Sequence, residues 1–325
     1  MILVTGGTGF IGTHLLERLA AQGERVRALV RRSGVTHRFP RAMPAGVETV
    51  YGDLASGAGL ADALRGAHAV IHLAGVTKAL RPRDYYTGNV RATEQLAHAM
   101  AGRGMRLVHV SSLAAMGPAT PGAPLAEDAE PHPLTHYGKS KLDAERVVRN
   151  LAPDAVIVRP PVVYGPRDTD VFQLLKSISK GLVLEIAGGE RWFSAIYVKD
   201  LVEGLLAAAG APRAAGRTYF LAHAKPVSWR QLGESAARIM ARTPRVLTVP
   251  FAVANAVGVC GELWARLSGT PGIVSREKIA EARRMAWTCD TGRAASELGF
   301  VAPTSLDEGL AATLAWYKEA GWLTY

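Results

Sequence analysis

The sequence has few cysteines, few aromatic residues and no long hydrophobic run, and each scarcity excludes a class of protein. Its two cysteines, Cys260 and Cys289, are too few for a disulfide framework and lack the spacing of metal ligands. The longest uncharged run, Val246 to Gly261, is shorter than the roughly 20 residues of a membrane-spanning helix and contains Pro250. We therefore expect a cytoplasmic protein with no metal site and no membrane span.

Acidic residues are also scarce, since 38 Lys and Arg face 28 Asp and Glu and give a net charge of +10. No basic stripe interleaved with aromatics and no DNA-binding motif accompanies this charge, so nucleic acid is not the expected partner. A chain of 325 residues can bury a large core, and we expect two lobes. One lobe, predicted to bind a dinucleotide, consists of residues 1–165 and 192–222. The other, predicted to bind a small-molecule substrate, consists of residues 166–191 and 223–325.

The first residues, ILVTGGTGFIG, read as a buried strand followed by a glycine turn. The next residues, THLLERLAAQG, have apolar side chains at helical spacing. Glycines let a backbone approach a pyrophosphate, and the free N–H groups at a helix start hold its charge. A Gly-rich turn is the plain alternative, but the strand and helix on either side favour a dinucleotide site. The contacts expected here are Gly6, Gly9, Phe10, Ile11 and Gly12.

The second strand, ERVRALV, lacks the acidic residue that NAD-preferring sites place at its end. Arg31 and Arg32 stand there instead, and guanidinium groups suit a 2′-phosphate. We therefore predict NADP(H), with NAD as the second possibility, although a solvated basic loop would look the same. After the third apolar stretch, Asp53 and its neighbour Leu54 are expected to meet the adenine, unless Asp53 caps the next helix.

Strand-like and helix-like segments then alternate along the chain, at 69–75, 89–100, 106–112, 137–150, 155–165 and 194–209. This alternation predicts an α/β fold with a parallel, doubly wound sheet, in which ligands bind beyond the carboxyl ends of the strands. Further cofactor contacts are therefore expected at the ends of the later strands: Leu73, Ala74, Gly75, Pro160 and Val163.

Tyr137 and Lys141 are four residues apart in YGKSKLDAERVVRN, whose periodicity predicts a helix over 137–150. An i, i+4 pair shares one helix face, and a lysine charge there favours the phenolate and lowers the tyrosine pKa. Such a tyrosine can exchange a proton with a substrate hydroxyl or carbonyl. An ordinary surface helix would carry the same residues, but the glycine loop upstream favours redox chemistry on a bound dinucleotide.

The segments TGGTGFIG, HLAG, NVRAT, HVSS, YGKSK and RPPVVYG, in this order, resemble the extended short-chain dehydrogenase/reductase family over nearly the whole chain. The resemblance implies that Tyr137 is the general acid/base. It also implies that Lys141 lowers the tyrosine pKa and binds the nicotinamide ribose, and that Ser112 positions the substrate oxygen. Asn89 matches a family asparagine with either a structural or a proton-relaying role.

Departures from the family pattern narrow the subclass. Dehydratases of the family carry an Asp-Glu pair where this chain has Leu113 and Ala114, so water elimination lacks its proton carriers. Epimerases of the family normally hold NAD tightly and have an acidic residue at the end of the second strand. Arg31 and Arg32 at this position look more like the residues of reductases in the family. Met116 replaces a usual tyrosine, which predicts a softer, more apolar pocket.

The C-terminal part looks like the carboxyl half of 3β-hydroxysteroid dehydrogenase-like and dihydroflavonol reductase-like members. Capping boxes at Ser228 and Ser305 predict the starts of two helices. Met116, Trp192 and Phe193 are expected either to wall the pocket or to lie in the core. The segment 117–133 is rich in Pro and Gly and is predicted to form a loop across the mouth of the cleft. The segment 246–267 is predicted to form a helix that covers the substrate, lies at an interface or belongs to the core.

We thus expect an NADP(H)-dependent oxidoreductase that interconverts a ketone and a secondary alcohol on a fairly apolar small molecule. Hydride would pass between the nicotinamide and the carbinol carbon while Tyr137 moves the proton. The alternatives are an NAD-dependent nucleotide-sugar epimerase and a non-catalytic dinucleotide-sensing protein, which would typically lack Tyr137 and Lys141. A homodimer through the helices at 89–104 and 137–150 is also expected from the resemblance.

Overall fold

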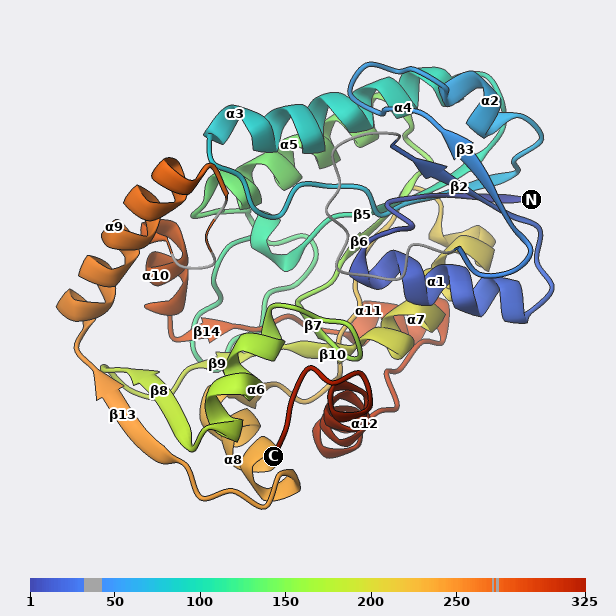
Figure 1. The fold of residues 1–325 in the computed structure, drawn as a ribbon. Coiled ribbons are helices and arrows are strands. Elements are labelled where there is room, and N and C mark those ends of the chain that lie inside the picture. The colour runs from blue at the N-terminus through green and yellow to red at the C-terminus, as the bar shows by residue number, and fades with distance from the viewer. Residues whose placement is uncertain (32–42, 271, 273–274) are drawn as a thin grey trace.

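Seven parallel strands form one central sheet in the computed structural model, which describes residues 1–31, 43–270, 272 and 275–325 (Figure 1). Its order is β11-β6-β5-β4-β1-β2-β3. Short runs rich in Val, Ile and Leu form these strands, because both faces of the sheet are covered by helices. Their bounds are β1 (Ile2–Thr5), β2 (Val26–Val30), β3 (Val47–Tyr51), β4 (Ala69–His72), β5 (Arg106–Val110), β6 (Val156–Arg159) and β11 (Thr218–Phe220).

Helices pack on both faces of this sheet. On one face, Leu15 and Leu16 of α1 and Leu201 and Leu205 of α7 are buried in one apolar cluster with the strands. On the other, helices α2, α4 and α5 bury a second cluster. The bounds are α1 (Phe10–Ala21), α2 (Leu60–Leu64), α3 (Pro82–Tyr86), a π-helical turn η1 (Thr87–Arg91), α4 (Ala92–Met100), η2 (Leu113–Ala115), α5 (His136–Leu151) and α7 (Val198–Gly210).

The strand order reverses beside β1, which lies between β2 and β4. In a doubly wound sheet this is the point where the loops part and leave a crevice at the carboxyl ends of the strands. The α/β fold and the parallel, doubly wound sheet predicted from the sequence are therefore confirmed. The predicted strand over 155–165 is broken at Pro160 and Pro161, neither of which can donate to a ladder, into β6 and β7 (Val162–Tyr164).

Smaller elements lie at the carboxyl side of the sheet, on the left and lower part of Figure 1. Three small sheets pair β7 with β10, β8 with β13, and β9 with β12 and β14. The strands are β8 (Leu182–Ile186), β9 (Trp192–Phe193), β10 (Ala195–Tyr197), β12 (Val227–Ser228), β13 (Arg245–Val249) and β14 (Ala286–Trp287). The helices are α6 (Val171–Ser179), α8 (Trp229–Ile239), α9 (Phe251–Ser268), α10 (Arg276–Ala282) and α12 (Leu306–Glu319). Elsewhere, α11 (Gly292–Leu298) packs against β11 and the short helix η3 (Pro212–Ala214) that precedes this strand.

Two helices of this part begin at the predicted residues. Ser228 and Ser305 each accept from the backbone three residues on, and Gln231 and Glu308 return the contact, so both capping boxes are formed. The division of the chain into a dinucleotide lobe and a substrate lobe stays a prediction. Within the described ranges, no helix has the length and apolar character to cross a bilayer.

Candidate functional site

The glycine turn after β1 has a shape that side chains would block. Gly6 has a φ of +72°, and a Cβ added to it would lie 2.6 Å from the Ala74 nitrogen. At Gly12 an added Cβ would lie 2.2 Å from the Gly6 carbonyl oxygen. Helix α1 then begins after Gly9 with neither a side-chain cap nor an acidic residue in its first turn. The free N–H groups and positive dipole end therefore suit the pyrophosphate of a dinucleotide.

The ends of β2 and β3 carry the next predicted cofactor contacts. Arg31 follows β2 and is exposed, while Arg32 lies outside the described residues. Asp53 does not cap α2, whose N-cap is Gly59; its Oδ1 instead accepts from the Ser56 backbone nitrogen at 2.9 Å. This contact shapes the loop after β3. A role for Asp53 at the adenine stays a prediction, as does the neighbouring contact from Leu54.

Asn89 holds the segment that follows β4 against helix α5. Its Oδ1 accepts from the Val76 nitrogen at 2.6 Å, and its Nδ2 donates to the Ser140 hydroxyl at 2.8 Å and to the Val76 carbonyl at 3.0 Å. The π-helical turn η1 carries this side chain, and π turns often mark functional sites. Both Oδ1 and Nδ2 of Asn89 are hydrogen-bonded to other protein groups. This favours a structural role for Asn89 over a proton-relaying one.

Gly75 lies between these groups and the candidate lysine. A Cβ added to Gly75 would lie 3.0 Å from Asn89 Oδ1 and 3.8 Å from Lys141 Nζ. With Leu73 and Ala74, which follow β4 next to Gly6, it lies at the switch point of the sheet. The carbonyl oxygen of Pro160, after β6, accepts from the Leu113 nitrogen at 2.9 Å. Val163 of β7 pairs with Ile196 of β10.

Ser112 and Tyr137 meet through two local structures. Ser112 caps the short helix η2, accepting from the Ala114 nitrogen at 3.1 Å, and its hydroxyl lies near enough to the Tyr137 phenol to lower the pKa of that phenol. Helix α5 begins just before Tyr137, with Thr135 as its N-cap. A Cβ on Gly138 would lie 2.3 Å from the Ala114 carbonyl oxygen, so this glycine lets α5 approach η2 closely. Sequence reasoning did not single out Gly138.

Lys141 lies one turn further along α5 and is buried, at 4% exposure. Its ammonium donates to the Val110 carbonyl at 2.8 Å, at the end of β5. Burial lowers the pKa of Lys141 to about 8, because a charged ammonium loses its water there. This group can therefore change its charge close to physiological pH.

The pKa of Tyr137 differs from the sequence expectation. Burial raises it, while the neighbouring Ser112 hydroxyl and the charge of Lys278 lower it by less. Lys278, on α10, is the lysine whose charge favours the phenolate, whereas Lys141 is turned to the Val110 carbonyl. The structure thus brings a second lysine to Tyr137, from a helix whose sequence gave no sign of it.

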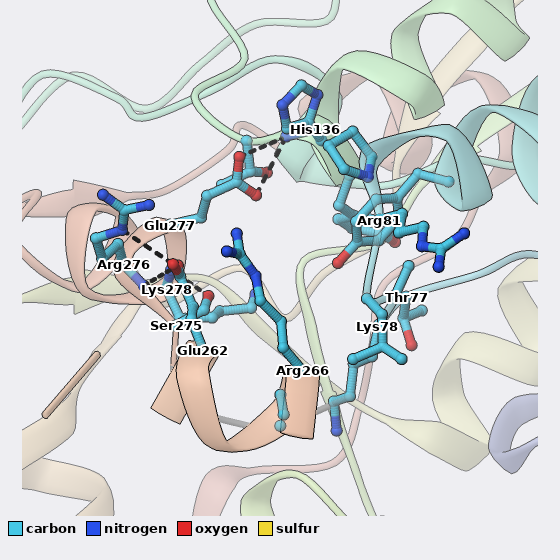
Figure 2. Close-up of a pocket in the computed structure, with 18 residues that line it drawn as sticks. Thr77, Lys78, Arg81, His136, Glu262, Arg266, Ser275, Arg276, Glu277 and Lys278 are labelled. Carbon is cyan, nitrogen blue, oxygen red and sulfur yellow. Dashed lines mark hydrogen bonds and ion pairs between the residues drawn. The ribbon is translucent and has the colours of Figure 1, made fainter. Parts of the chain in front are cut away.

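Figure 2 shows a cavity of about 290 Å³. Tyr137 is one of the residues that line it. One wall is the segment 77–82 with Tyr85, whose ring centroid lies 6.3 Å from that of Tyr137. The opposite wall comes from α9 and α10, including Ala265 and Arg266. Several of the residues that line the cavity are basic: Lys78, Arg81, Arg266, Arg276 and Lys278.

Helix α10 is fastened to the start of α5 by its acidic residues. Glu277 accepts from the His136 backbone nitrogen at 3.2 Å, and Glu281 accepts from the Thr135 hydroxyl at 3.2 Å. Glu281 also pairs with Lys278 at 2.7 Å. The only sequence signal was the N-cap serine, Ser275, which accepts from the Lys278 nitrogen and marks where α10 begins.

The residues expected to wall the pocket do not line this cavity. Met116 and Phe193 are 1% and 2% exposed and belong to apolar clusters, so the core alternative holds for them. Trp192 is on the small strand β9, paired with β12 and β14. Segment 117–133 does not line the cavity either; it hydrogen-bonds along residues 286–290, as in Leu125 to Thr288 at 2.9 Å.

Segment 246–267 forms β13 and most of α9, and it does cover the cavity. Glu262, Ala265 and Arg266 face the cavity, as expected of a substrate-covering helix. The core-helix alternative is wrong, because the buried residues of α9 are only Ala254, Gly258 and Ala265. Within the part of the chain that the structure describes, no cluster of three or more His, Cys, Asp or Glu side chains is arranged for a metal ion.

Known proteins match this chain over almost its full length. A ceramide reductase from Caulobacter vibrioides is 32% identical over 99% of this chain and 96% of its own. An N-acetyl-alpha-D-glucosaminyl-diphospho-ditrans,octacis-undecaprenol 4-epimerase from Escherichia coli O157:H7 is 28% identical over 96% and 94%. The structure of MoeE5 with UDP-glucuronic acid and NAD superposes with a TM-score of 0.76 at 27% identity, covering 98% of this chain and 99% of that one.

A family model described as the NAD dependent epimerase/dehydratase family matches residues 2–222. This range contains the glycine turn, Ser112, Tyr137 and Lys141. The relatives that match are reductases and epimerases, and the matching structure of MoeE5 contains NAD. The chain belongs to the NAD-dependent epimerase/dehydratase family and is an oxidoreductase or epimerase of the extended short-chain dehydrogenase/reductase type.

Proposed function

We propose that the protein is an NADP(H)-dependent reductase of a ketone on an apolar, chain-bearing small molecule. The observation that carries the proposal is the closeness of the Ser112 hydroxyl to the phenol of Tyr137, which lines a cavity together with Leu80 and Ala265. A ketone oxygen placed between these two hydroxyls would accept a hydrogen bond from each. The reductase from Caulobacter vibrioides, at 32% identity, supports the reaction class.

The residues present fit a nicotinamide dinucleotide. The turn Gly6–Gly12 and the start of α1 would hold the pyrophosphate, and Lys141, beside Gly75, would face the nicotinamide ribose. Arg31, with Arg32, would hold the 2′-phosphate of NADP(H), since the chain has no acid after β2. When bound, the cofactor supplies the hydride that reduces the carbonyl carbon.

The protein's own part is to move a proton. Tyr137 would donate its phenolic proton to the alcohol oxygen as the hydride arrives, and Ser112 would hold that oxygen in place. A phenol with a raised pKa is a proton donor at neutral pH, and the charge of Lys278 limits how far its pKa rises. In the oxidation direction the same phenolate would accept the proton.

A nucleotide-sugar epimerase is the second candidate, and one observation favours it. The cations that line the cavity, among them Lys78, Arg81 and Arg266, would suit a substrate diphosphate. The epimerase from Escherichia coli O157:H7 covers this chain almost as completely as the reductase does. The two candidates differ in how they hold the cofactor, because an epimerase must retain its NAD through a catalytic cycle that returns it unchanged.

The test is to denature the purified protein, identify released dinucleotide by mass spectrometry, and titrate emptied protein with NADPH and NADH. Tighter, exchangeable binding of NADPH, together with NADPH oxidation in the presence of long-chain ketones, is the expected result. Stoichiometric release of NAD, with no net oxidation of NADPH by any ketone, would overturn the reductase in favour of the epimerase.

A further inference from the structure

The outer side of helix α9 is an exposed apolar surface. At about 100° per residue, an arc of about 160° around the helix contains only apolar side chains, all exposed. Trp264 and Leu267, near its C-terminal end, are 73% and 84% exposed. We call this arc the α9 apolar face; its members are Ala252, Val253, Ala256, Val257, Val259, Cys260, Leu263, Trp264 and Leu267.

This face continues onto the strand that precedes it. Val246 and Leu247 of β13 are more than half exposed, as is Leu184 of β8, the strand that pairs with β13. In Figure 1, β8, β13 and α9 follow one another along the left margin of the molecule, with no other described element outside them. Contiguous exposed apolar surface of this kind marks a site of interaction with a partner or a membrane.

Basic residues accompany the face. Between residues 242 and 284 the chain has seven Lys and Arg but only three Asp and Glu. Arg266 is next to the apolar arc, is exposed, and forms no ion pair within the described residues. Arg283 and Arg284, on the adjacent α10 side, are also exposed. An apolar helix face with a tryptophan and flanking cations has the chemistry of an interfacial helix on an anionic lipid surface.

A second copy of the chain fits this surface less well. In a two-fold interface the same patch meets itself, so Arg266 would be brought towards its own equivalent and towards the other flanking cations. Like charges across an interface oppose association, whereas anionic headgroups neutralise them. The charge on either side of the arc therefore favours a lipid surface as the occupant.

The opposite side of helix α9 lines the cavity. Ala265 and Arg266 line the cavity that reaches Tyr137, while Trp264 and Leu267, immediately beside them, point to the outside. We propose that the α9 apolar face docks the protein on an anionic membrane surface and places the cavity mouth at the headgroups. The passage of an apolar ketone from the lipid into the cavity rests on the proposed function, but the docking itself does not.

The test is sedimentation of the full-length protein with vesicles of phosphatidylcholine alone or with 30% phosphatidylglycerol. We expect binding to the anionic vesicles that weakens with added salt, and a partition coefficient roughly tenfold or more lower for Trp264→Ser with Leu267→Ser. Val301→Ser is the matched control, because Val301 is 63% exposed but lies between α11 and α12. It should bind like the parent protein.

A second readout uses Cys260, which is exposed on the face, whereas Cys289 is buried. An environment-sensitive maleimide on Cys260 should shift to shorter wavelength when anionic vesicles are added. Failure of the parent protein to bind either vesicle would overturn the proposal, as would equal binding by the double variant. A dimer in solution that the double variant converts to a monomer, without vesicle binding, would assign the face to a second copy instead.

NADPH oxidation with a short, water-miscible ketone separates this proposal from the proposed function. Trp264 and Leu267 do not line the cavity, so the double variant should keep the parent rate in that assay. Vesicle binding without any reductase activity would leave the docking surface in place and overturn only the reductase. If the double variant loses both its activity and its cooperative unfolding transition, it has not folded. The Cys260 label then decides the proposal, because it is read on a protein that keeps Trp264 and Leu267.

Discussion

At the scale of single residues, the proposed chemistry depends on Tyr137, and removal of its hydroxyl tests that directly. Tyr137→Phe keeps the ring beside Tyr85 but leaves Ser112 without its phenolic partner. We expect kcat to fall by about 10²–10⁴-fold, the usual contribution of a positioned acid or base, with little change in NADPH affinity. Steady-state kinetics and a fluorescence titration measure the two effects. Turnover within a factor of two of the parent would contradict the assignment.

Gly12 is the residue at which the cofactor loop is least tolerant of a side chain. In Gly12→Ala the new methyl would lie 2.2 Å from the Gly6 carbonyl oxygen, so the turn that carries the pyrophosphate would have to move. We expect NADPH affinity to fall by at least about tenfold, since one misplaced charge-assisted hydrogen bond costs about 1.5–3 kcal/mol. Gly210→Ala is the control, because nothing lies within 4 Å of its added Cβ. Equal affinities in the two variants would contradict the loop's role.

Lys141 should reduce stability while it serves the reaction. Its pKa of about 8 in the folded protein lies below its ordinary 10.5, so below pH 8 the folded state bears the cost of a buried charge. Between about pH 8 and 10.5 the unfolded chain binds a proton that the folded protein does not, so stability rises with pH. We expect Lys141→Met to gain about 1–3 kcal/mol at pH 7 and this gain to shrink by pH 9.5.

Urea unfolding at several pH values measures the gain from Lys141→Met, and Lys139→Met, an exposed change on the same helix, is the control. The control should change stability little at any pH. A gain for Lys141→Met that is constant from pH 7 to 9.5 would show that the buried charge is not its cause.

At the scale of elements, α5 is held to the sheet by a buried ion pair. Glu145 accepts from Arg159 of β6 at 2.7 and 2.8 Å, and both side chains are almost wholly buried. Burial alone would raise the pKa of Glu145, but the hydrogen bonds and charge of Arg159 hold it below its ordinary value. The pair thereby fixes the helix that carries Tyr137 and Lys141.

Glu145→Gln should leave Arg159 buried without its counter-charge and cost about 3–5 kcal/mol of stability. Asp143→Asn is the control on the same helix, because its pair with Arg146 is exposed and should be worth less than about 1 kcal/mol. Since the pKa of Glu145 is lowered, its contribution is complete above the carboxyl's unfolded value and is lost as pH falls through the folded value. The difference between parent and Glu145→Gln should therefore shrink in acid, and a difference under 1 kcal/mol at pH 7 would contradict the argument.

The elements also show what sequence could predict. The glycine turn and the Tyr137 helix were predictable because a strand, a turn and a helix that follow one another in sequence carry their own signals. The contact of α10 with α5 was not, since Glu277 and His136 are 141 residues apart and neither belongs to a motif. For the same reason the charge of Lys278 at Tyr137 was missed. The sequence also left open whether Met116 walls the pocket or lies in the core, and the fold packs it in the core with Phe220 and Cys289.

At the scale of the whole molecule, charge and topology act together on the cofactor. The excess of 38 basic over 28 acidic residues gives a positive field that attracts an anionic dinucleotide. The sheet collects at one edge the ends of strands whose residues come from distant parts of the sequence, such as Gly6, Gly75 and Val110. A ligand that contacts several of these ends links them, so its binding should stabilise the entire fold rather than one loop.

This linkage gives a prediction about cofactor choice that needs no substrate. A ligand that binds only the folded state adds about 2.7 kcal/mol at 100 times its Kd, which would raise Tm by several degrees in a chain of this size. We expect NADPH to raise Tm more than NADH at equal concentration, because Arg31 takes the place of the acid that would hold a free 2′-hydroxyl. Gly12→Ala should show a clearly smaller shift with either, about half of the parent's for a tenfold loss of affinity. A larger shift with NADH would mean that the exposed Arg31 is a solvated side chain and would move the preference to NAD.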